Sequence, residues 1–390
     1  MKKITFVGTG YVGLVGGAGI SEFGHQVTCA DIDQNKIERL KAGEIPIYEP
    51  GLESLVKQNV AKGRLHFSHD VPKSIQIGRA HIIFVAVGTP QGSNGEANLS
   101  SIESVAKTIG ENLNGYKIIC TKSTVPVGTG KRIEEIIRSM NPNGDFDYVS
   151  NPEFLREGAA VKDFLHPDRV VIGTRTQKAI KVMGEVYRPL YINETPIIST
   201  TVETAEMIKY AANAFLSLKI SYINEIANLC EAVGADVQDV ARAMGLDGRI
   251  SAKFLHPGPG YGGSCFPKDT HALAATGQKN RSPLLTVEAA IKTNASQKVR
   301  MVDKLKRLIG GSFKGKTVAV LGLAFKPQTD DVREAASIVI VSNLAESGAA
   351  VQAYDPIAMD NFKNHFPNIQ YFNSWQDAVK NADACILLTE

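Results

Sequence analysis

The sequence has little of what nucleic-acid-binding and membrane proteins need. Lys and Arg nowhere form a dense run, and the 390 residues carry a formal net charge of only +3. This balance excludes a strongly basic surface for nucleic acid or for an anionic membrane. The longest apolar stretches, at 81–87 and 317–323, are strand-sized and far shorter than the roughly 18 residues of a membrane span. We therefore expect a soluble protein whose basic character is local, at an anionic ligand.

Cysteine is scarce and irregularly placed, with five residues in the whole chain. This usage does not suit a disulfide framework and fits a reducing compartment. The first eight residues begin a β-strand at once, without a cleavable apolar segment or a lipidation motif. We therefore predict a cytoplasmic location.

Chain length and the order of the apolar runs predict several domains. A chain of 390 residues is too long for one ordinary core. In residues 1–195, short β-rich runs alternate with longer amphipathic stretches, a pattern typical of a parallel, doubly wound sheet. We expect its strands at residues 4–7, 26–30, 81–87, 117–122, 148–150 and 169–173.

A different pattern begins near residue 200. Residues 201–233 contain neither Pro nor Gly and stop before Gly234, which predicts one helix roughly 50 Å long at about 1.5 Å per residue. A helix of that length is expected to connect two domains, and its small and apolar side chains suit a subunit interface. Helical segments continue to about residue 309, interrupted by a loop rich in Gly and Pro at 256–263.

A second α/β unit begins at Lys316, with strands expected at 317–321, 350–354 and 384–388. The predicted fold class is α/β, with two Rossmann-like doubly wound domains joined by a long central helix and a helical dimerisation region. The predicted domains are 1–195, 196–310 and 311–390. We expect the last domain to be truncated, because a helix and further strands normally continue a sheet of this type.

A glycine-rich turn, Gly8-Thr9-Gly10-Tyr11-Val12-Gly13, follows the first strand and opens a helix-compatible stretch. Its glycines allow a tight turn in which a pyrophosphate can approach backbone N–H groups at a helix N-terminus. The second strand ends at Asp31, the usual distance for a carboxylate that binds the ribose hydroxyls. Asp31 would repel a 2′-phosphate and no arginine follows it, so the motif favours NAD over NADP.

Three other loops follow predicted strands of the same sheet. Residues 87–90 and 122–126 fall at its carboxyl edge, where doubly wound folds bind ligands. Residues 151–157 follow the strand at 148–150 and add two carboxylates, Glu153 and Glu157. Either carboxylate is a general base or a helix-capping charge.

A glycine-dense loop at 257–264 leads to the strongest candidate nucleophile, Cys265. Lys268 and Asp269 stand three and four residues after it. Nearby positive charge favours the thiolate, the form that attacks a carbonyl carbon. The alternative is a small side chain packed in a turn, which the charged neighbours disfavour. The other cysteines occupy apolar contexts and are expected to be inert core residues; they are Cys29, Cys120, Cys230 and Cys385.

The predicted long helix carries a second polar pair. Lys209 and Asn213 are four residues apart, so their side chains share one face and could converge on a single oxygen. A solvated lysine and an incidental amide explain the helix equally well. The helix alone leaves both interpretations open.

Five ordered segments together resemble the UDP-glucose/GDP-mannose dehydrogenase family over essentially the whole chain. They are GTGYVGL, KSTVPVGT, NPEFLREG, EMIKYAANAF and GYGGSCFPKD. The resemblance implies an N-terminal NAD-binding domain, a long central helix that forms a homodimer, and a C-terminal domain that binds a uridine nucleotide. It also implies that two hydride transfers oxidise UDP-glucose to UDP-glucuronate, which feeds polysaccharide synthesis. A thiohemiacetal and then a thioester would form on Cys265.

The resemblance also assigns residues to roles. The expected catalytic residues are Cys265, Lys209, Asn213, Asp269, Glu153 and Thr124. Among them, Lys209 and Asn213 would stabilise the oxyanion, while Asp269, Thr124 and Glu153 would hold or activate water, Glu153 being the favoured base. The expected cofactor-binding residues are Gly8, Gly10, Tyr11, Val12, Gly13, Asp31, Lys36, Thr89, Pro90, Thr124, Glu157, Lys268 and Arg333. The expected substrate-binding residues are Glu153, Phe154, Leu155, Arg156, Lys209, Asn213, Arg249, Phe254, His256, Tyr261, Gly262, Phe325 and Lys326. Arg249 would reach a neighbouring subunit, and no metal is expected.

Three other interpretations stay open. The catalytic motifs do not fix the sugar, so the nearest alternative is a dehydrogenase of GDP-mannose or UDP-N-acetylmannosamine, although FLHPGPGYGG and GGSCFPKD favour UDP-glucose. A two-electron 3-hydroxyacid or 6-phosphogluconate dehydrogenase would share the N-terminal domain but needs no cysteine. A non-catalytic sensor of NAD or of a nucleotide sugar would bind its ligand without turnover.

Overall fold

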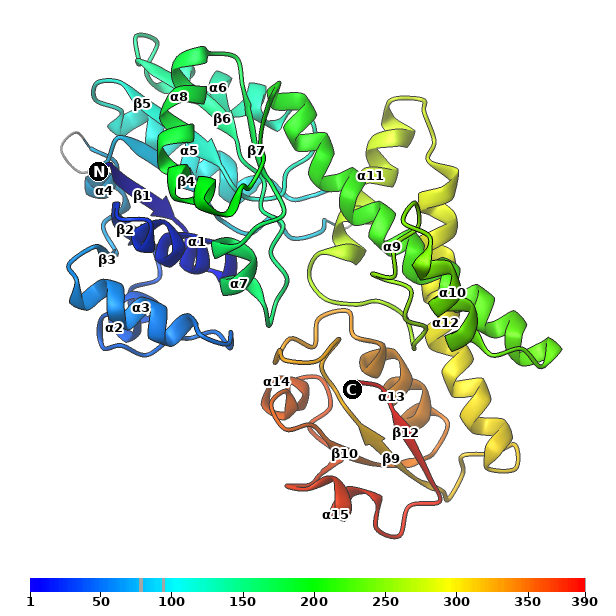
Figure 1. Ribbon diagram of the computed structural model, residues 1–390. Coiled ribbons are helices and arrows are strands. Elements are labelled where there is room, and N and C mark those ends of the chain that lie inside the picture. Colours follow the sequence, from blue (N-terminus) through cyan, green and yellow to red (C-terminus); the bar gives the residue numbers. More distant parts are fainter. Residues whose placement is uncertain (77–79, 93–94, 390) are drawn as a thin grey trace. The chain divides into compact units, whose positions relative to one another are not determined.

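The computed structural model describes residues 1–76, 80–92 and 95–389, and the chain divides into two compact units, Met1–Tyr210 and Ala211–Glu390 (Figure 1). Each unit contains its own β-sheet with helices packed against it. The predicted α/β class with two Rossmann-like sheets is confirmed. The three predicted domain ranges remain a prediction.

An eight-stranded sheet forms the centre of the N-terminal unit, in the order β3-β2-β1-β4-β5-β6-β7-β8. Its strands are β1 (Lys3–Val7), β2 (Gln26–Ala30), β3 (Leu65–Ser68), β4 (Ile82–Val85), β5 (Lys117–Thr121), β6 (Phe146–Ser150), β7 (Val170–Thr174) and β8 (Ile197–Thr200). The strand order reverses between β1 and β4. The carboxyl ends of these two strands therefore form the switch point at which doubly wound sheets bind ligands.

Helices connect the strands and cover both faces of this sheet. They are α1 (Tyr11–Glu22), α2 (Gln34–Lys41), α3 (Leu52–Ala61), α4 (Val71–Ile75), α5 (Ser100–Asn112), α6 (Thr129–Met140), α7 (Ala160–Leu165), α8 (Gln177–Val186) and the 3-10 helix η1 (Arg188–Asn193). In β4, Ile82 and Phe84 pack into the layer that contains α1, whereas Ile83 and Val85 pack into the layer that contains α5 and α6. Alternate side chains are thus buried on opposite faces, which explains why the strand reads as a continuous apolar run.

The prediction of a wholly parallel sheet is wrong for the last two strands. β7 pairs antiparallel with β6, through Val149 with Thr174 and Ser150 with Gly173, and β8 then runs parallel to β7. The connection after β6 contains the six-residue α7 and enters β7 from the opposite end. An antiparallel neighbour needs no crossover that returns the chain to the starting edge of the sheet. The predicted strand set also lacked β3 and β8.

The long helix predicted from residues 201–233 is α9, Val202–Val233, with 32 residues. It passes through the boundary between the two units and stops before Gly234, whose φ of 75° is left-handed. Glycine takes that conformation without the penalty that a Cβ atom imposes, so it ends the helix where the sequence predicts.

After α9, the described part of the C-terminal unit contains six helices and a four-stranded parallel sheet in the order β11-β10-β9-β12. Its elements after α9 are α10 (Val237–Leu246), α11 (Phe266–Lys279), α12 (Leu285–Leu308), β9 (Thr317–Leu321), α13 (Ala336–Glu346), β10 (Ala350–Tyr354), α14 (Met359–Lys363), β11 (Gln370–Tyr371), α15 (Trp375–Val379) and β12 (Ala384–Leu387). Val318, Val320 and Ile340 lie in the core of this part. One expectation fails: Cys385 is exposed, because β12 is an edge strand whose alternate side chains face away from the core.

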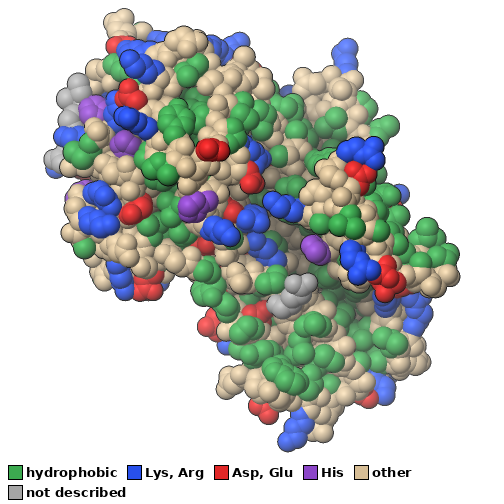
Figure 2. Space-filling view, in the orientation of Figure 1, with side chains coloured by type: hydrophobic (Ala, Val, Ile, Leu, Met, Phe, Trp, Pro, Cys, Tyr) green, Lys and Arg blue, Asp and Glu red, His purple; other side chains and the backbone are tan. Residues whose placement is uncertain are grey.

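The surface carries mixed charge. On the face drawn in Figure 2, Lys and Arg side chains are interspersed with Asp and Glu side chains over the N-terminal unit. Among the helices in the described part of the chain, none combines the length and the hydropathy of a membrane span.

Candidate functional site

The turn between β1 and α1 can exist only with glycine at two positions. Gly8 has a φ of 101°, and a Cβ atom there would lie 2.5 Å from the Ala86 carbonyl oxygen. A Cβ atom at Gly13 would lie 2.0 Å from the Gly8 carbonyl oxygen. At Gly10, which precedes α1, a Cβ atom would meet nothing within 4 Å. The turn is therefore tightly packed underneath and open at the helix N-terminus, as the approach of a pyrophosphate requires.

Asp31 follows β2 and is bound to this turn. Its Oδ2 accepts hydrogen bonds of 2.7 Å from both the backbone N–H and the hydroxyl of Thr9, and Lys36 Nζ lies 3.5 Å away. Burial alone would raise the pKa of Asp31, but the hydrogen bonds from Thr9 and Asp33 and the charge of Lys36 lower it overall. The side chain is therefore held as a carboxylate beside the glycine turn, which fits a partner for ribose hydroxyls.

Tyr11 joins the glycine turn to the segment 151–158 through a residue that the sequence did not single out. Its hydroxyl donates to Glu49, which also accepts N–H bonds from Gly158 at 2.7 Å and from Ala160 at 2.8 Å. Burial, the hydrogen bond to Glu49 and the charges of Glu49 and Glu157 raise the pKa of Tyr11 far above its ordinary value. The tyrosine therefore remains a neutral donor at physiological pH.

The loops after β4 and β5 are also joined. The hydroxyl of Thr89 donates to the backbone oxygen of Thr124 at 2.9 Å. Glu206, from the first turns of α9, accepts N–H bonds of 2.7 Å from Gly128 and Gly130 at the start of α6. The predicted ligand-binding loops are thus fixed by contacts inside the N-terminal unit, while Pro90 is exposed at their edge.

The two acidic candidates of the segment 151–157 differ in surroundings. Glu153 is 7% exposed and accepts a 3.0 Å bond from Lys209 and a second bond from the Leu155 N–H. Lys209 Nζ also lies 5.5 Å from the ring centre of Phe154. Glu157 is half-buried beside Tyr11. The buried Glu153–Lys209 pair excludes a solvated lysine, and the convergence of Lys209 and Asn213 on one oxygen stays a prediction.

Lys122 is a buried cation beneath this segment. It is 4% exposed, and its Nζ lies 3.2 Å from Asn151 Oδ1 and 3.4 Å from the Tyr187 hydroxyl. Burial lowers its pKa to about 8, although the charge of Glu153 raises it. Its position directly before Ser123 and Thr124 makes it a support for two of the candidate loops.

In the C-terminal unit, Cys265 stands directly before α11. Asp269 lies one helical turn on, is fully buried, and accepts bonds from Asn213 Nδ2 at 2.6 Å and from Lys268. Positive charge and a helix N-terminus both favour a thiolate. Asp269 thus contacts an amide and a cation, and its N–H donates to the Cys265 carbonyl oxygen at 2.8 Å. We call these four residues the thiol cluster: Asn213, Cys265, Lys268 and Asp269.

The remaining predicted substrate residues of this unit lie in three places. Tyr261 and Phe254 pack around Phe266, with ring centres 6.0 Å from it in both pairs. Gly263 packs so closely on Phe325 that a Cβ atom would lie 2.7 Å from that ring. His256 is exposed in the same loop as Tyr261 and Gly262, and Lys326 Nζ lies 5.6 Å from the Phe325 ring centre.

Three predicted arginines are engaged with carboxylates. Arg156 binds Asp163 at 2.6 Å, Arg249 binds Asp247 at 2.6 Å, and Arg333 binds Asp331 at 2.7 Å. The three side chains are 57%, 91% and 63% exposed, so each can exchange its partner at modest cost. Their assignments to substrate, a neighbouring subunit and NAD stay predictions.

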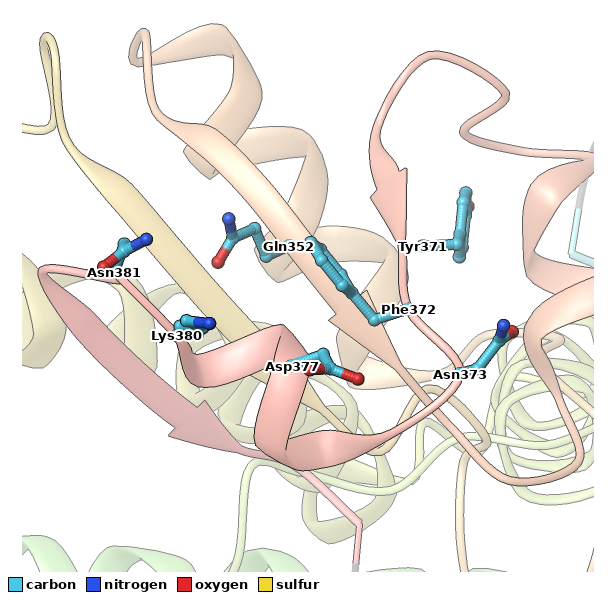
Figure 3. A pocket seen from close by; sticks show the side chains of 7 residues that line it. All are labelled: Gln352, Tyr371, Phe372, Asn373, Asp377, Lys380 and Asn381. Carbon is cyan, nitrogen blue, oxygen red and sulfur yellow. The ribbon is translucent and has the colours of Figure 1, made fainter.

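A separate hollow in the C-terminal sheet has a volume of about 370 Å³ (Figure 3). It is lined by Gln352, Tyr371, Phe372, Asn373, Asp377, Lys380 and Asn381, none of which belongs to the predicted site. Within residues 1–76, 80–92 and 95–389, no group of three or more His, Cys, Asp or Glu side chains is arranged to hold a metal ion.

Sequence reasoning missed the residues that support these loops from a distance. Glu49 and Glu206 are the acidic examples, and Lys122, Asn294 and Lys298 are buried polar side chains of the same kind. The available signal was a polar residue on the apolar face of a helix or strand. This signal does not identify the partners, because they are backbone groups far away in sequence.

Comparison with known proteins covers the whole chain. Three models of the UDP-glucose/GDP-mannose dehydrogenase family match it: the NAD binding domain at residues 2–191, the central domain at 203–296 and the UDP binding domain at 319–390. The UDP-glucose 6-dehydrogenase of Rhizobium meliloti (strain 1021) is 51% identical over 391 residues, covering 100% of this chain and 89% of that protein. UDP-glucose 6-dehydrogenase TuaD of Bacillus subtilis (strain 168) is 51% identical over 392 residues, with 100% and 84% covered.

A solved structure agrees with these relatives. The UDP-glucose dehydrogenase of the hyperthermophilic archaeon Pyrobaculum islandicum superposes with a TM-score of 0.96 at 36% identity, covering 100% of this chain and 90% of that one. The glycine turn with Asp31 lies within the matched NAD binding domain, and Asn213, Cys265, Lys268 and Asp269 lie within the matched central domain. The chain therefore belongs to the UDP-glucose/GDP-mannose dehydrogenase family and is an NAD-dependent oxidoreductase.

Proposed function

We propose that this protein oxidises UDP-glucose to UDP-glucuronate in two NAD-dependent steps, with Cys265 as the covalent nucleophile. The observation that carries the proposal is the thiol cluster, in which Asp269 binds both Asn213 and Lys268 one helical turn from Cys265. A two-electron dehydrogenase does not need this cluster. The sugar is chosen because both curated relatives at 51% identity are named for UDP-glucose.

NAD supplies the hydride acceptor for both oxidations. The residues present fit such a dinucleotide: Gly8 and Gly13 allow the tight turn, Gly10 leaves the helix N-terminus open, and Asp31 is held as a carboxylate for ribose. The proposed cofactor set is completed by Tyr11, Val12, Lys36, Thr89, Pro90, Thr124, Glu157, Lys268 and Arg333.

Cys265 accounts for the second oxidation. The first step converts the C6 alcohol to an aldehyde and releases one proton. The Cys265 thiolate then forms a C–S bond to the aldehyde carbon, and the resulting alkoxide takes up a proton to give a thiohemiacetal. Loss of a second hydride and a proton leaves a thioester. Water adds to its carbonyl carbon, the C–S bond breaks, and the thiolate leaves with a carboxylate as product.

Lys209 and Asn213 supply the proposed oxyanion stabilisation, since an ammonium and an amide N–H both donate to a developing negative charge. Both are buried, at 3% and 6% exposure, which strengthens such interactions. Glu153 is the proposed base that takes a proton from water, because it is the buried carboxylate paired with Lys209. Thr124 and Asp269 hold the water in this proposal.

The rest of the assignment follows the same reasoning. We assign residues 1–195 to NAD binding, 196–310 to a central dimerisation domain built on α9, and 311–390 to uridine nucleotide binding. Substrate contacts come from Phe154, Leu155, Arg156, Phe254, His256, Tyr261, Gly262, Phe325 and Lys326. A homodimer with Arg249 donated to the neighbouring subunit, and a cytoplasmic location, complete the proposal.

The test counts NADH formed per nucleotide sugar consumed, with UDP-glucose, GDP-mannose and UDP-N-acetylmannosamine offered separately. We expect two NADH per UDP-glucose, and a Cys265→Ser protein that forms no UDP-glucuronate. The matched control is Cys230→Ser, which changes a buried cysteine outside the thiol cluster. One NADH per sugar, or full turnover by Cys265→Ser, contradicts the thioester route. Two NADH formed only from another nucleotide sugar would agree with the thioester route but would refute UDP-glucose as the substrate.

A further inference from the structure

Three buried polar side chains lie along one face of α12, and none belongs to the predicted site. Asn294, Gln297 and Lys298 are 7%, 4% and 6% exposed. Their spacing of three and four residues places them on the same side of the helix. Burial of an amide or an ammonium group costs free energy unless its hydrogen bonds are made. Their partners therefore indicate what these side chains do.

Asn294 holds both polar groups of one residue in the loop before Cys265. The Tyr261 N–H donates to Asn294 Oδ1 at 2.7 Å, and Asn294 Nδ2 donates to the Tyr261 carbonyl oxygen at 3.0 Å. Gln297 Nε2 donates to the Gly258 carbonyl oxygen at 2.9 Å. Because glycine has more backbone freedom than any other residue, these bonds fix a segment that would otherwise adopt many conformations.

Lys298 binds a different segment, the loop between β9 and α13. Its Nζ donates to the Glu334 carbonyl oxygen at 2.8 Å. Glu334 has a φ of 52°, in the left-handed region that a non-glycine residue adopts only at a cost. The bond from Lys298 therefore opposes relaxation of the backbone at Glu334.

The two segments meet directly before Cys265. The Gly263 N–H donates to the Arg333 carbonyl oxygen at 2.8 Å. A Cβ atom at Gly262 would lie 2.4 Å from the Glu334 carbonyl oxygen, and one at Gly263 would lie 2.7 Å from the Phe325 ring. The loop 257–264 and the loop 325–334 are thus packed backbone against backbone, so that a displacement of one moves the other.

We infer that Asn294 and Lys298 are positioning residues that hold these two loops in one arrangement, and that they thereby couple a nucleoside diphosphate bound at Phe325 and Lys326 to the alignment of Cys265. The inference rests on the proposed function. Neither side chain contacts the sulfur atom in this scheme; both act through backbone groups of the loops on either side. Misplacement of a reacting group by about 1 Å can cost about 100-fold in rate, so such positioning has a measurable effect.

The experiment measures the rate at which iodoacetamide alkylates Cys265, with and without saturating UDP, by mass spectrometry of the peptide that contains it. Site-resolved detection is needed because Cys385 is exposed and will also react. In the wild-type protein we expect UDP to change the rate at Cys265 several-fold. In Lys298→Met we expect a change of less than twofold at UDP concentrations that calorimetry shows to be saturating, and a fall of about 10- to 100-fold in kcat with an unchanged KM for NAD.

Three further variants test whether the change in the UDP effect comes from the hydrogen bonds of Lys298 and Asn294. Lys298→Arg keeps a donor and should restore the UDP effect. Asn294→Asp keeps the oxygen that accepts from the Tyr261 N–H but loses the N–H that donates to the Tyr261 carbonyl oxygen. If Lys298→Met fails to fold, the same alkylation experiment is done with Asn294→Asp. Asn280→Asp is the matched control, because its amide donates at 2.8 Å to the carbonyl oxygen of Thr276 in α11, and it should behave as wild type.

An equal UDP effect in the wild-type and Lys298→Met proteins, or no UDP effect in the wild type, overturns the coupling. Both results are independent of turnover. Failure of the proposed function would show instead as the absence of UDP-glucose oxidation by the wild-type protein.

Discussion

The pKa of Glu206 is set by two opposing effects, burial of the carboxyl group and the N–H groups of a helix N-terminus. Its carboxylate is 2% exposed and accepts two N–H bonds of 2.7 Å at the start of α6. Burial raises its pKa from 4.5 to about 7, although the N–H groups of Gly128 and Gly130 lower it; the charge of Glu203 adds to the increase and that of Arg175 opposes it. The perturbation is Glu206→Gln, which preserves the shape but cannot titrate.

A folded-state pKa above the unfolded value means that protonation stabilises the fold. This contribution is complete below pH 4.5 and is lost as the pH rises through about 7. The difference between the two values corresponds to about 3 kcal/mol, most of it between pH 5 and 8. The glutamine variant loses a constant amount, about 1 to 3 kcal/mol, for one unpaired N–H. We therefore expect the free energy of unfolding of the variant, relative to wild type, to improve by about 2 to 3 kcal/mol from pH 5 to pH 8.

Urea unfolding at four pH values, followed by circular dichroism, measures this change. The single tryptophan, Trp375, lies in the C-terminal unit, so its fluorescence identifies the transition that the substitution should leave unchanged. Glu53→Gln is the matched control, because that carboxylate is 64% exposed, binds Lys57 on the surface of α3 and does not act on Glu206. A relative stability that is constant with pH, or that moves against the variant, would show that the helix N-terminus outweighs burial and would refute the reasoning.

Three other predictions follow from buried or bound charges. Asp31→Asn should raise the KM for NAD about 10- to 100-fold with the KM for the sugar unchanged, because a hydrogen bond to a charged acceptor contributes about 1.5 to 3 kcal/mol. NAD titrations at a fixed sugar concentration measure this, and an unchanged KM for NAD contradicts it. Burial lowers the pKa of the Lys122 ammonium to about 8, so between pH 8 and 10.5 the folded protein loses this proton while the unfolded chain keeps it, and wild type gains stability as the pH rises. Lys122→Met should abolish this gain. Denaturant unfolding across that pH range is the assay, and an equal dependence of stability on pH in the two proteins would exclude the effect. Glu49→Gln should destabilise the protein by about 1 to 3 kcal/mol more than Tyr11→Phe, since the N–H groups of Gly158 and Ala160 bind different oxygens of Glu49 and an amide has only one acceptor atom. Denaturant midpoints of the two variants decide it, and similar midpoints would count against it.

Strands that are buried on both faces, such as β4 and β5, are predicted correctly from the sequence. Ile83 and Ile119 belong to such apolar runs, and a run of this kind reports a central parallel strand directly. β3 carries an exposed His66 in a four-residue strand, so its sequence has neither a run nor an alternation to detect. The antiparallel direction of β7 is a property of its pairing with β6, through Val149 and Thr174, which strand composition does not encode.

The residues of the candidate site also fall into those that the sequence can identify and those that it cannot. Gly8, Gly13 and Cys265 could be proposed from the sequence because the features that single them out are close in sequence. The partners of Lys209 were not, since Glu153 is 56 residues away. A helix shows which side chains share a face but not what that face meets.

Glycine-rich loops at this site explain why so many polar side chains are buried. A glycine loop admits a ligand because it has no side chains, and for the same reason it cannot hold its own conformation. Side chains from distant elements do so by binding backbone groups: Asp31 at Thr9, Glu49 at Gly158 and Ala160, Glu206 at Gly128 and Gly130, Asn294 at Tyr261, and Asp355 at Leu323, Ala324, Ile357 and Ala358. These residues should tolerate isosteric substitution worse than core residues do, because a change of one atom leaves an N–H group buried and unpaired, whereas a core can repack around a similar volume.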